Sequence, residues 1–148
     1  MQKELLMEIL AQNQVTCGFA FQKLSTENLS LRLNDNTASL GFIYRHIGET
    51  MNMFGAFFGE IMGVENTTMG QEDKGQGKVL EDSVKLVSQG YEMLQRLVEN
   101  NTDSWWLEEI DTPFFGRVTR IRLFAHVLFH NAHHAGQLSL TLARGSRI

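Results

Sequence analysis

Four of the five histidines in the chain fall close together near the C-terminus, at positions 126, 130, 133 and 134. On a helix, with about 100° of rotation per residue, these four side chains and Gln137 share one sector of about 100°. His130 and His134 stand at i and i+4, so their imidazoles lie on adjacent turns. Two such rings can reach one metal ion at nitrogen–metal distances of about 2.0–2.1 Å.

A pair of histidines on one helix does not complete a metal site. A third ligand has to come from another element, and His46 is the one histidine left in the sequence. Metal sites in helical bundles are built in this way, from side chains on facing helices. Glu49 follows His46 by about one helical turn. It is a candidate general base or weak ligand, with a solvent-facing or interhelical charge as the alternative.

The string from His126 to Gln137, HVLFHNAHHAGQ, resembles the signature near the C-terminus of the DinB family. The segment from Tyr44 to Ile47 resembles that family's first metal-ligand helix, and the chain length and helix order are also similar. The resemblance implies a bundle of four helices in which three histidines bind one divalent metal ion, usually zinc or nickel. The ligands it implies are His46, His130 and His134.

The same resemblance suggests what the metal does. Some members of the family are transferases or isomerases that use a low-molecular-weight thiol with a small-molecule substrate. Because a metal-bound thiol is deprotonated at neutral pH and remains a nucleophile, the preferred hypothesis is a metal-dependent thiol transferase. The alternatives are a hydrolase that uses metal-bound hydroxide and a non-catalytic metal- or ligand-binding stress protein.

No catalytic residue follows from the sequence, but three residues are candidates for supporting roles. Gln137 can orient a ligand or substrate, or serve only in helix packing. His126 is a hydrogen-bonded neighbour or a fourth ligand, and Glu49 is the third candidate. Gly136 predicts that another backbone approaches the helix closely.

The sequence lacks the residues that two other catalytic chemistries need. A metalloprotease of the HExxH type needs a glutamate beside the first histidine, and position 131 is Asn131. The single cysteine, Cys17, falls on a helical apolar face and is expected in the core rather than as a nucleophile.

Long helices must position these residues, and the chain has a single proline, Pro113, to interrupt them. Apolar residues at helical spacing predict an all-α fold, an antiparallel four-helix bundle. The predicted helices run from Gln2 to Leu24, Ala38 to Met62, Val79 to Asn100 and Thr119 to Arg144.

The connections between these helices carry the stop and start signals. Residues 34–37 offer N-caps for the second helix, and Thr119 is the predicted N-cap of the fourth. Gly63 is predicted to end the second helix and Gly145 the fourth. Residues 63–78 are expected to form a long flexible linker between the second and third helices. The connection from the third to the fourth helix, residues 102–118, is irregular and is expected to hold a short hairpin.

The composition of the chain limits which classes of protein it can belong to. A chain of 148 residues with 43% apolar content predicts one domain, residues 1–148. A net charge of −4 without a basic stripe argues against general nucleic-acid binding. One cysteine excludes an internal disulfide.

The N-terminus has no signal-peptide pattern, and charges interrupt the most apolar stretch, Leu40 to Met62. The chain is therefore expected to be cytoplasmic and free of membrane spans.

Aromatic residues exceed what one buried stripe needs. Phe54, Phe57 and Phe58 wrap around the second predicted helix, so at least one ring points away from the core. This surplus predicts a homodimer, with pocket lining as the alternative. Trp105 and Trp106 either cap the mouth of the site or pack in the core.

Overall fold

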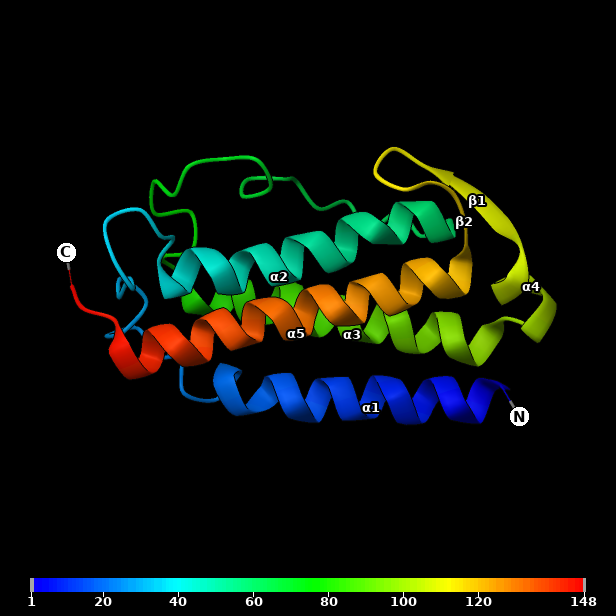
Figure 1. The fold of residues 1–148 in the computed structure, drawn as a ribbon, viewed down its shortest axis with the longest axis horizontal. Coiled ribbons are helices and arrows are strands. Elements are labelled where there is room, and N and C mark those ends of the chain that lie inside the picture. The colour runs from blue at the N-terminus through cyan, green and yellow to red at the C-terminus, as the bar shows by residue number, and fades with distance from the viewer. Residues whose placement is uncertain (1, 148) are drawn as a thin grey trace.

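The computed structural model describes residues 2–147, which form a mostly helical protein. Four long helices lie side by side along the longest axis (Figure 1): α1 (Gln2–Phe21), α2 (Leu40–Gly55), α3 (Leu80–Asn100) and α5 (Arg120–Arg144). The short elements are η1 (Ala56–Phe58), α4 (Asp103–Leu107), β1 (Glu109–Thr112) and β2 (Gly116–Thr119). Within the described residues the two strands pair only with each other, as an antiparallel hairpin. The helical class is therefore as predicted, and the hairpin falls where the sequence suggested one.

The helices α2 and α3 run in the same direction, so the predicted antiparallel arrangement is wrong for this pair of helices. Gly48 packs against Leu86, and Gly90 packs against Met51 further along both helices. The long connection from residue 56 to 79 carries the chain back along the molecule before α3 begins (Figure 1). At about 3.3 Å per extended residue, such a connection easily spans a helix of about 30 Å.

The helix α1 packs against α3 and α5 and closes the core. Asn13 of α1 donates a hydrogen bond to the Leu128 carbonyl of α5 and accepts one from the Tyr91 hydroxyl of α3. The largest fully buried side chains include Trp106, Phe124, Ile47, Met51, Leu94 and Leu138. Among the described residues, none of the helices has the length and apolar character that a membrane crossing requires.

The second helix ends earlier than predicted, at Gly55 rather than Met62. After η1, Gly59 adopts a left-handed conformation with φ of 87°, and the Glu60 amide donates back to the Gly55 carbonyl at 2.8 Å. Gly59 is therefore the stop glycine, because it alone in this turn takes positive φ without strain. Ile61, which falls inside the predicted second helix, is 94% exposed.

Helix starts are set by hydroxyl side chains. Ser39, not one of residues 34–37, caps α2 by accepting from the Phe42 amide, because Asn34 and Thr37 bond to each other in a turn of their own. Thr119 caps α5 as predicted by accepting from the Arg122 amide. Gly145 follows the end of α5 as predicted, although its backbone is extended rather than left-handed.

The connection between α2 and α3 packs on the helices, so the expectation of a flexible linker is wrong. Thr68 is 2% exposed, and its neighbour Thr67 bonds to α2 through both its amide and its hydroxyl. A side chain on Gly77 would collide with the backbone of Gly41 at the start of α2. Glycine at position 77 therefore allows the end of the connection to lie against α2.

The aromatic residues of α2, η1 and α4 pack inside the molecule. Trp106 is 1% exposed and packs edge-on against Phe124, with ring centroids 5.2 Å apart. Phe54 and Phe58 are buried, and Phe57 packs against the core. The surplus of rings on the second helix therefore gives no argument for a dimer, and the tryptophans pack at one end of the core.

Candidate metal centre

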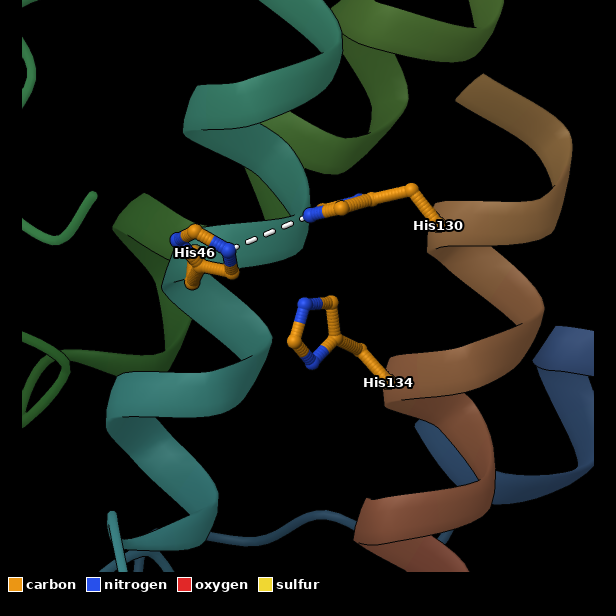
Figure 2. A group of neighbouring side chains, drawn as sticks. All are labelled: His46, His130 and His134. Atoms are coloured by element: carbon orange, nitrogen blue, oxygen red, sulfur yellow. Dashed lines mark hydrogen bonds between the residues drawn. The ribbon is translucent and has the colours of Figure 1, made fainter. Parts of the chain in front are cut away.

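His46 on α2 and His130 and His134 on α5 converge on one space between the two helices (Figure 2). One ligand atom from each ring lies within 4.8 Å of the others. The Nε2 atoms of His46 and His130 are 3.1 Å apart. Two nitrogens bound to one tetrahedral ion at about 2.0–2.1 Å are separated by about 3.3–3.4 Å. The His46–His130 pair is therefore close to the separation that a single ion requires, and His134 is near enough to be the third ligand.

The orientation of the His46 ring is fixed by a hydrogen bond at its Nδ1 atom. Its Nδ1 lies 3.1 Å from the Thr68 hydroxyl, which itself donates to a Glu49 carboxylate oxygen at 2.7 Å. Since the hydroxyl proton is already used, the Thr68 oxygen accepts from Nδ1–H of His46. This network assigns the tautomer that leaves the Nε2 lone pair of His46 directed at the other two histidines.

Glu49 is fully buried and is not among the residues that line the pockets at the centre. Its carboxylate accepts hydrogen bonds from the Arg45 side chain at 2.6 Å, from the Thr67 hydroxyl at 2.6 Å and from the Thr67 amide at 2.9 Å. Burial opposes ionisation, but the bonds from Thr67, Thr68 and Arg45 overcome it and hold the pKa of Glu49 below its usual value. Glu49 thus anchors residues 67–68 behind His46.

On α5 the two histidines are held differently. The Nδ1 of His134 lies 2.6 Å from Oε1 of Gln137, which accepts a hydrogen bond from Nδ1–H. The lone pair of Nε2 is then available to bind an ion. The Nδ1 of His130 is buried and has no hydrogen-bond partner in the part of the chain that the structure describes. Gln137 therefore lies where the sequence placed it, next to a candidate ligand.

The three imidazoles are neutral at physiological pH, as metal ligands must be. Burial, reinforced by the neighbouring His134, lowers the pKa of His46 to about 4. Burial and the two other histidines lower the pKa of His130 to about 3. Burial also lowers the pKa of His134, against the hydrogen bond that its ring donates to Gln137, which raises it.

Two pockets open onto the centre. One, of about 490 Å³, has His46, His134, Gln137 and Thr68 in its wall. The other, of about 290 Å³, includes all three histidines and has a largely aromatic lining. Neither tryptophan lines these pockets, so neither caps the centre.

The remaining candidates lie outside the cluster. His126 sits one turn before His130, with its ring centroid 6.4 Å from that of His130 and 4.6 Å from that of Phe115. A side chain on Gly136 would meet no atom within 4 Å, so the expected close backbone approach at that glycine is wrong. Cys17 is fully buried in the core, as predicted.

Thr67 and Thr68 were not identified from the sequence. They lie in an irregular connection, where no periodicity indicates which side chains turn inward. The only available signal was Glu49, since an acidic residue on a buried helix face requires hydrogen-bond donors from another element.

A family model described as the DinB superfamily matches residues 14–138, which include all three histidines. No curated protein matches the chain. The match covers most of the sequence and confirms the family resemblance of the histidine motif. The chain belongs to the DinB superfamily.

Proposed function

We propose that this member of the DinB superfamily is a metal-dependent enzyme that uses a small thiol as its nucleophile, an S-transferase in reaction type. The observation that carries the proposal is the convergence of His46, His130 and His134 beside two open pockets. A purely structural metal site is usually closed by four protein ligands, whereas three ligands leave a position for a reactant.

The proposed ion is zinc or nickel, bound through three neutral imidazoles. Affinity for nitrogen ligands rises towards the later first-row divalent metals, and availability then decides between them. When bound, the ion would lower the pKa of a thiol so that it reacts as the thiolate. In the overall reaction a bond forms between sulfur and an electrophilic carbon, and that carbon loses its leaving group with the bonding electron pair. The thiol proton passes to solvent.

The chain's own residues orient the centre and the reactants. Thr68, backed by Glu49, sets the ring of His46, and Gln137 sets the ring of His134. The wall of the larger pocket is mostly apolar but includes Asn36 and Thr37, whose polar side chains suit the polar groups of a low-molecular-weight thiol. No group of the chain is assigned as a general base.

Elemental analysis of protein purified without an affinity tag tests the metal. About one zinc or nickel ion per chain is expected, and His130→Ala should lose it. A thiol-conjugation screen on the loaded protein, with His130→Ala as control, then tests the reaction. Less than about 0.1 ion per chain would contradict the metal site. A full site without conjugation would favour the non-catalytic binding protein.

The proposal also covers the whole molecule. We take the four long helices as a four-helix bundle, the chain as a cytoplasmic protein and its solution form as a homodimer. The support for the dimer is a row of exposed apolar side chains along α1, namely Leu5, Ile9, Val15 and Phe19. The cytoplasmic location is consistent with a single cysteine that is buried.

A further inference from the structure

Two phenylalanines occupy the tip of the β1–β2 hairpin, where burial does not explain them. Phe114 is 56% exposed and Phe115 is 41% exposed. The tip is held in a defined turn, because the Thr112 hydroxyl accepts from the Phe115 amide and donates to the Gly116 carbonyl. Large apolar side chains held at an exposed turn are typical of a binding surface rather than of a core.

The two rings fold back towards the metal centre. The ring of Phe114 lies 6.0 Å from that of Phe54 on α2, measured between centroids. The ring of Phe115 lies 4.6 Å from that of His126 on α5, and His126 in turn lies 5.6 Å from Phe54. These tilted and edge-on contacts are the favoured geometries of aromatic pairs. The hairpin tip thus completes an aromatic wall that begins on the two helices carrying the histidines.

This wall lines the smaller of the two pockets at the centre, which is open to solvent. The pocket of about 290 Å³ is lined by Phe54, Phe114, Phe115 and His126 on one side and reaches His46, His130 and His134. Its volume is at the lower end of the range for small-molecule sites, about 300–1,000 Å³. It suits a compact aromatic ring better than an extended molecule, for which the larger pocket has more room.

A buried hydroxyl in the same pocket lacks a partner. Thr50 lines the pocket and is 2% exposed, yet its Oγ1 has no hydrogen-bond partner among the described residues. A buried hydroxyl without a hydrogen bond costs free energy, so an acceptor supplied by a ligand would be stabilising there.

We propose that this pocket binds the aromatic ring of the electrophilic acceptor, with a carbonyl or similar acceptor atom of that substrate directed at the Thr50 hydroxyl. The proposal rests on the thiol-transfer function above and names the substrate class for it. Phe115 and Phe114 act as specificity-determining residues, which hold the ring so that its electrophilic carbon faces the histidine centre. Sulfur then approaches from the larger pocket, since His46 and His134 border both.

Ligand binding without reaction tests this assignment. Fluorine NMR would follow 4-fluoroacetophenone, a ring with a carbonyl and no leaving group, as it binds the metal-free and the zinc-loaded protein. We expect Phe115→Ala to weaken binding by about threefold to tenfold. Phe19→Ala, which removes a more exposed ring on α1 (66% against 41% for Phe115), should leave binding unchanged. Thr50→Val should weaken binding of this ketone but not of 4-fluoroethylbenzene, which has no carbonyl.

Equal binding by Phe115→Ala and Phe19→Ala would overturn the proposal, as would an absence of ketone binding to the wild-type protein. A Thr50→Val variant that binds the ketone as tightly as wild type would overturn the role of the hydroxyl. These outcomes are independent of the proposed reaction. Binding that depends on Phe115 without any conjugation contradicts the transferase alone. Conjugation together with binding that ignores Phe115 contradicts this pocket alone.

Discussion

At the scale of single residues, the hydrogen bonds behind His46 decide which of its nitrogens faces the centre. Glu49 holds Thr68, and Thr68 holds the Nδ1 proton of His46. A glutamine at position 49 would present an amide N–H₂ to groups that already donate, so at least one of the bonds to Thr67, Thr68 or Arg45 would be lost. The ring of His46 would then be oriented less firmly.

Glu49→Gln is therefore expected to weaken metal affinity by about 10- to 100-fold, the usual effect of removing such a supporting partner. Competition with a chelating dye measures the affinity. Glu60→Gln is the matched control, because the only polar contact of the Glu60 side chain among the described residues is a surface ion pair with Arg96 at 3.5 Å. Equal affinities for the two variants would show that the Thr68 contact does not position His46.

The buried histidines also make the stability of the metal-free protein depend on pH. In the unfolded chain a histidine has a pKa of about 6.5, whereas folding lowers that of His46 to about 4 and that of His130 to about 3. Between pH 7 and 5 the unfolded state therefore binds protons that the folded state does not. The folded state is favoured most at neutral pH and loses stability as the pH falls through this window.

The midpoint of thermal unfolding should accordingly fall between pH 7 and 5 in metal-free protein. The double variant His46→Gln/His130→Gln should show a shallower fall, since two of the responsible groups are gone. Replacing the exposed His133 by glutamine is the control. Parallel curves for wild type and the double variant would rule out these histidines as the source of the pH dependence.

The residues of the site were more predictable than their supports. The i, i+4 spacing of His130 and His134 indicates a shared helical face, and the scarcity of histidines left only His46 to join them. The structure brings the three together as expected, and their binding of metal stays a prediction. Thr68 and Thr50 were missed, because their roles depend on contacts between segments that no local pattern encodes.

At the scale of elements, close packing between α2 and α3 depends on glycine. A Cβ on Gly48 would lie 2.7 Å from the Cβ of Leu86 and 3.0 Å from the amide nitrogen of Val87. Because the backbone of α3 cannot move away without loss of packing, Gly48→Ala should lower the free energy of unfolding by about 1–3 kcal/mol.

A glycine-to-alanine substitution on α5 should instead raise the free energy of unfolding. A Cβ on Gly136 meets nothing within 4 Å, so Gly136→Ala should gain the helix propensity of alanine, up to about 1 kcal/mol. Urea unfolding of both variants measures the difference. If both substitutions shift the midpoint in the same direction, the packing distances do not determine the outcome.

The elements themselves were predictable to within a few residues, except where a loop contact intervened. Apolar periodicity identified all four long helices. It could not identify the direction of α3, because the connection before it is long enough for either orientation. The true end of α2 was missed because Gly59 and Gly63 are equivalent stop signals in the sequence, and only the η1 turn selects between them.

At the scale of the whole molecule, the outer side of α1 remains to be explained. Leu5, Ile9, Val15 and Phe19 are each more than half exposed, and within the described residues nothing covers this row. They lie on one side of a helix of 20 residues, where the exposed polar side chains of Gln12 and Thr16 separate two apolar pairs. A stable dimer buries about 800 Å² on each partner, and a net charge of −4 is too small to prevent contact.

If two copies associate through α1, sedimentation at tens of micromolar should give twice the mass of one chain. The double variant Ile9→Glu/Phe19→Glu should sediment as a single chain, because pairing would bury unpaired carboxylates in an apolar interface. Val84→Glu, at a 46% exposed apolar position on α3, is the matched control and should leave the dimer intact. A wild-type protein with the mass of one chain would contradict this prediction. A dimer that survives the double variant would place the interface elsewhere than α1, since no apolar contact there would tolerate both charges.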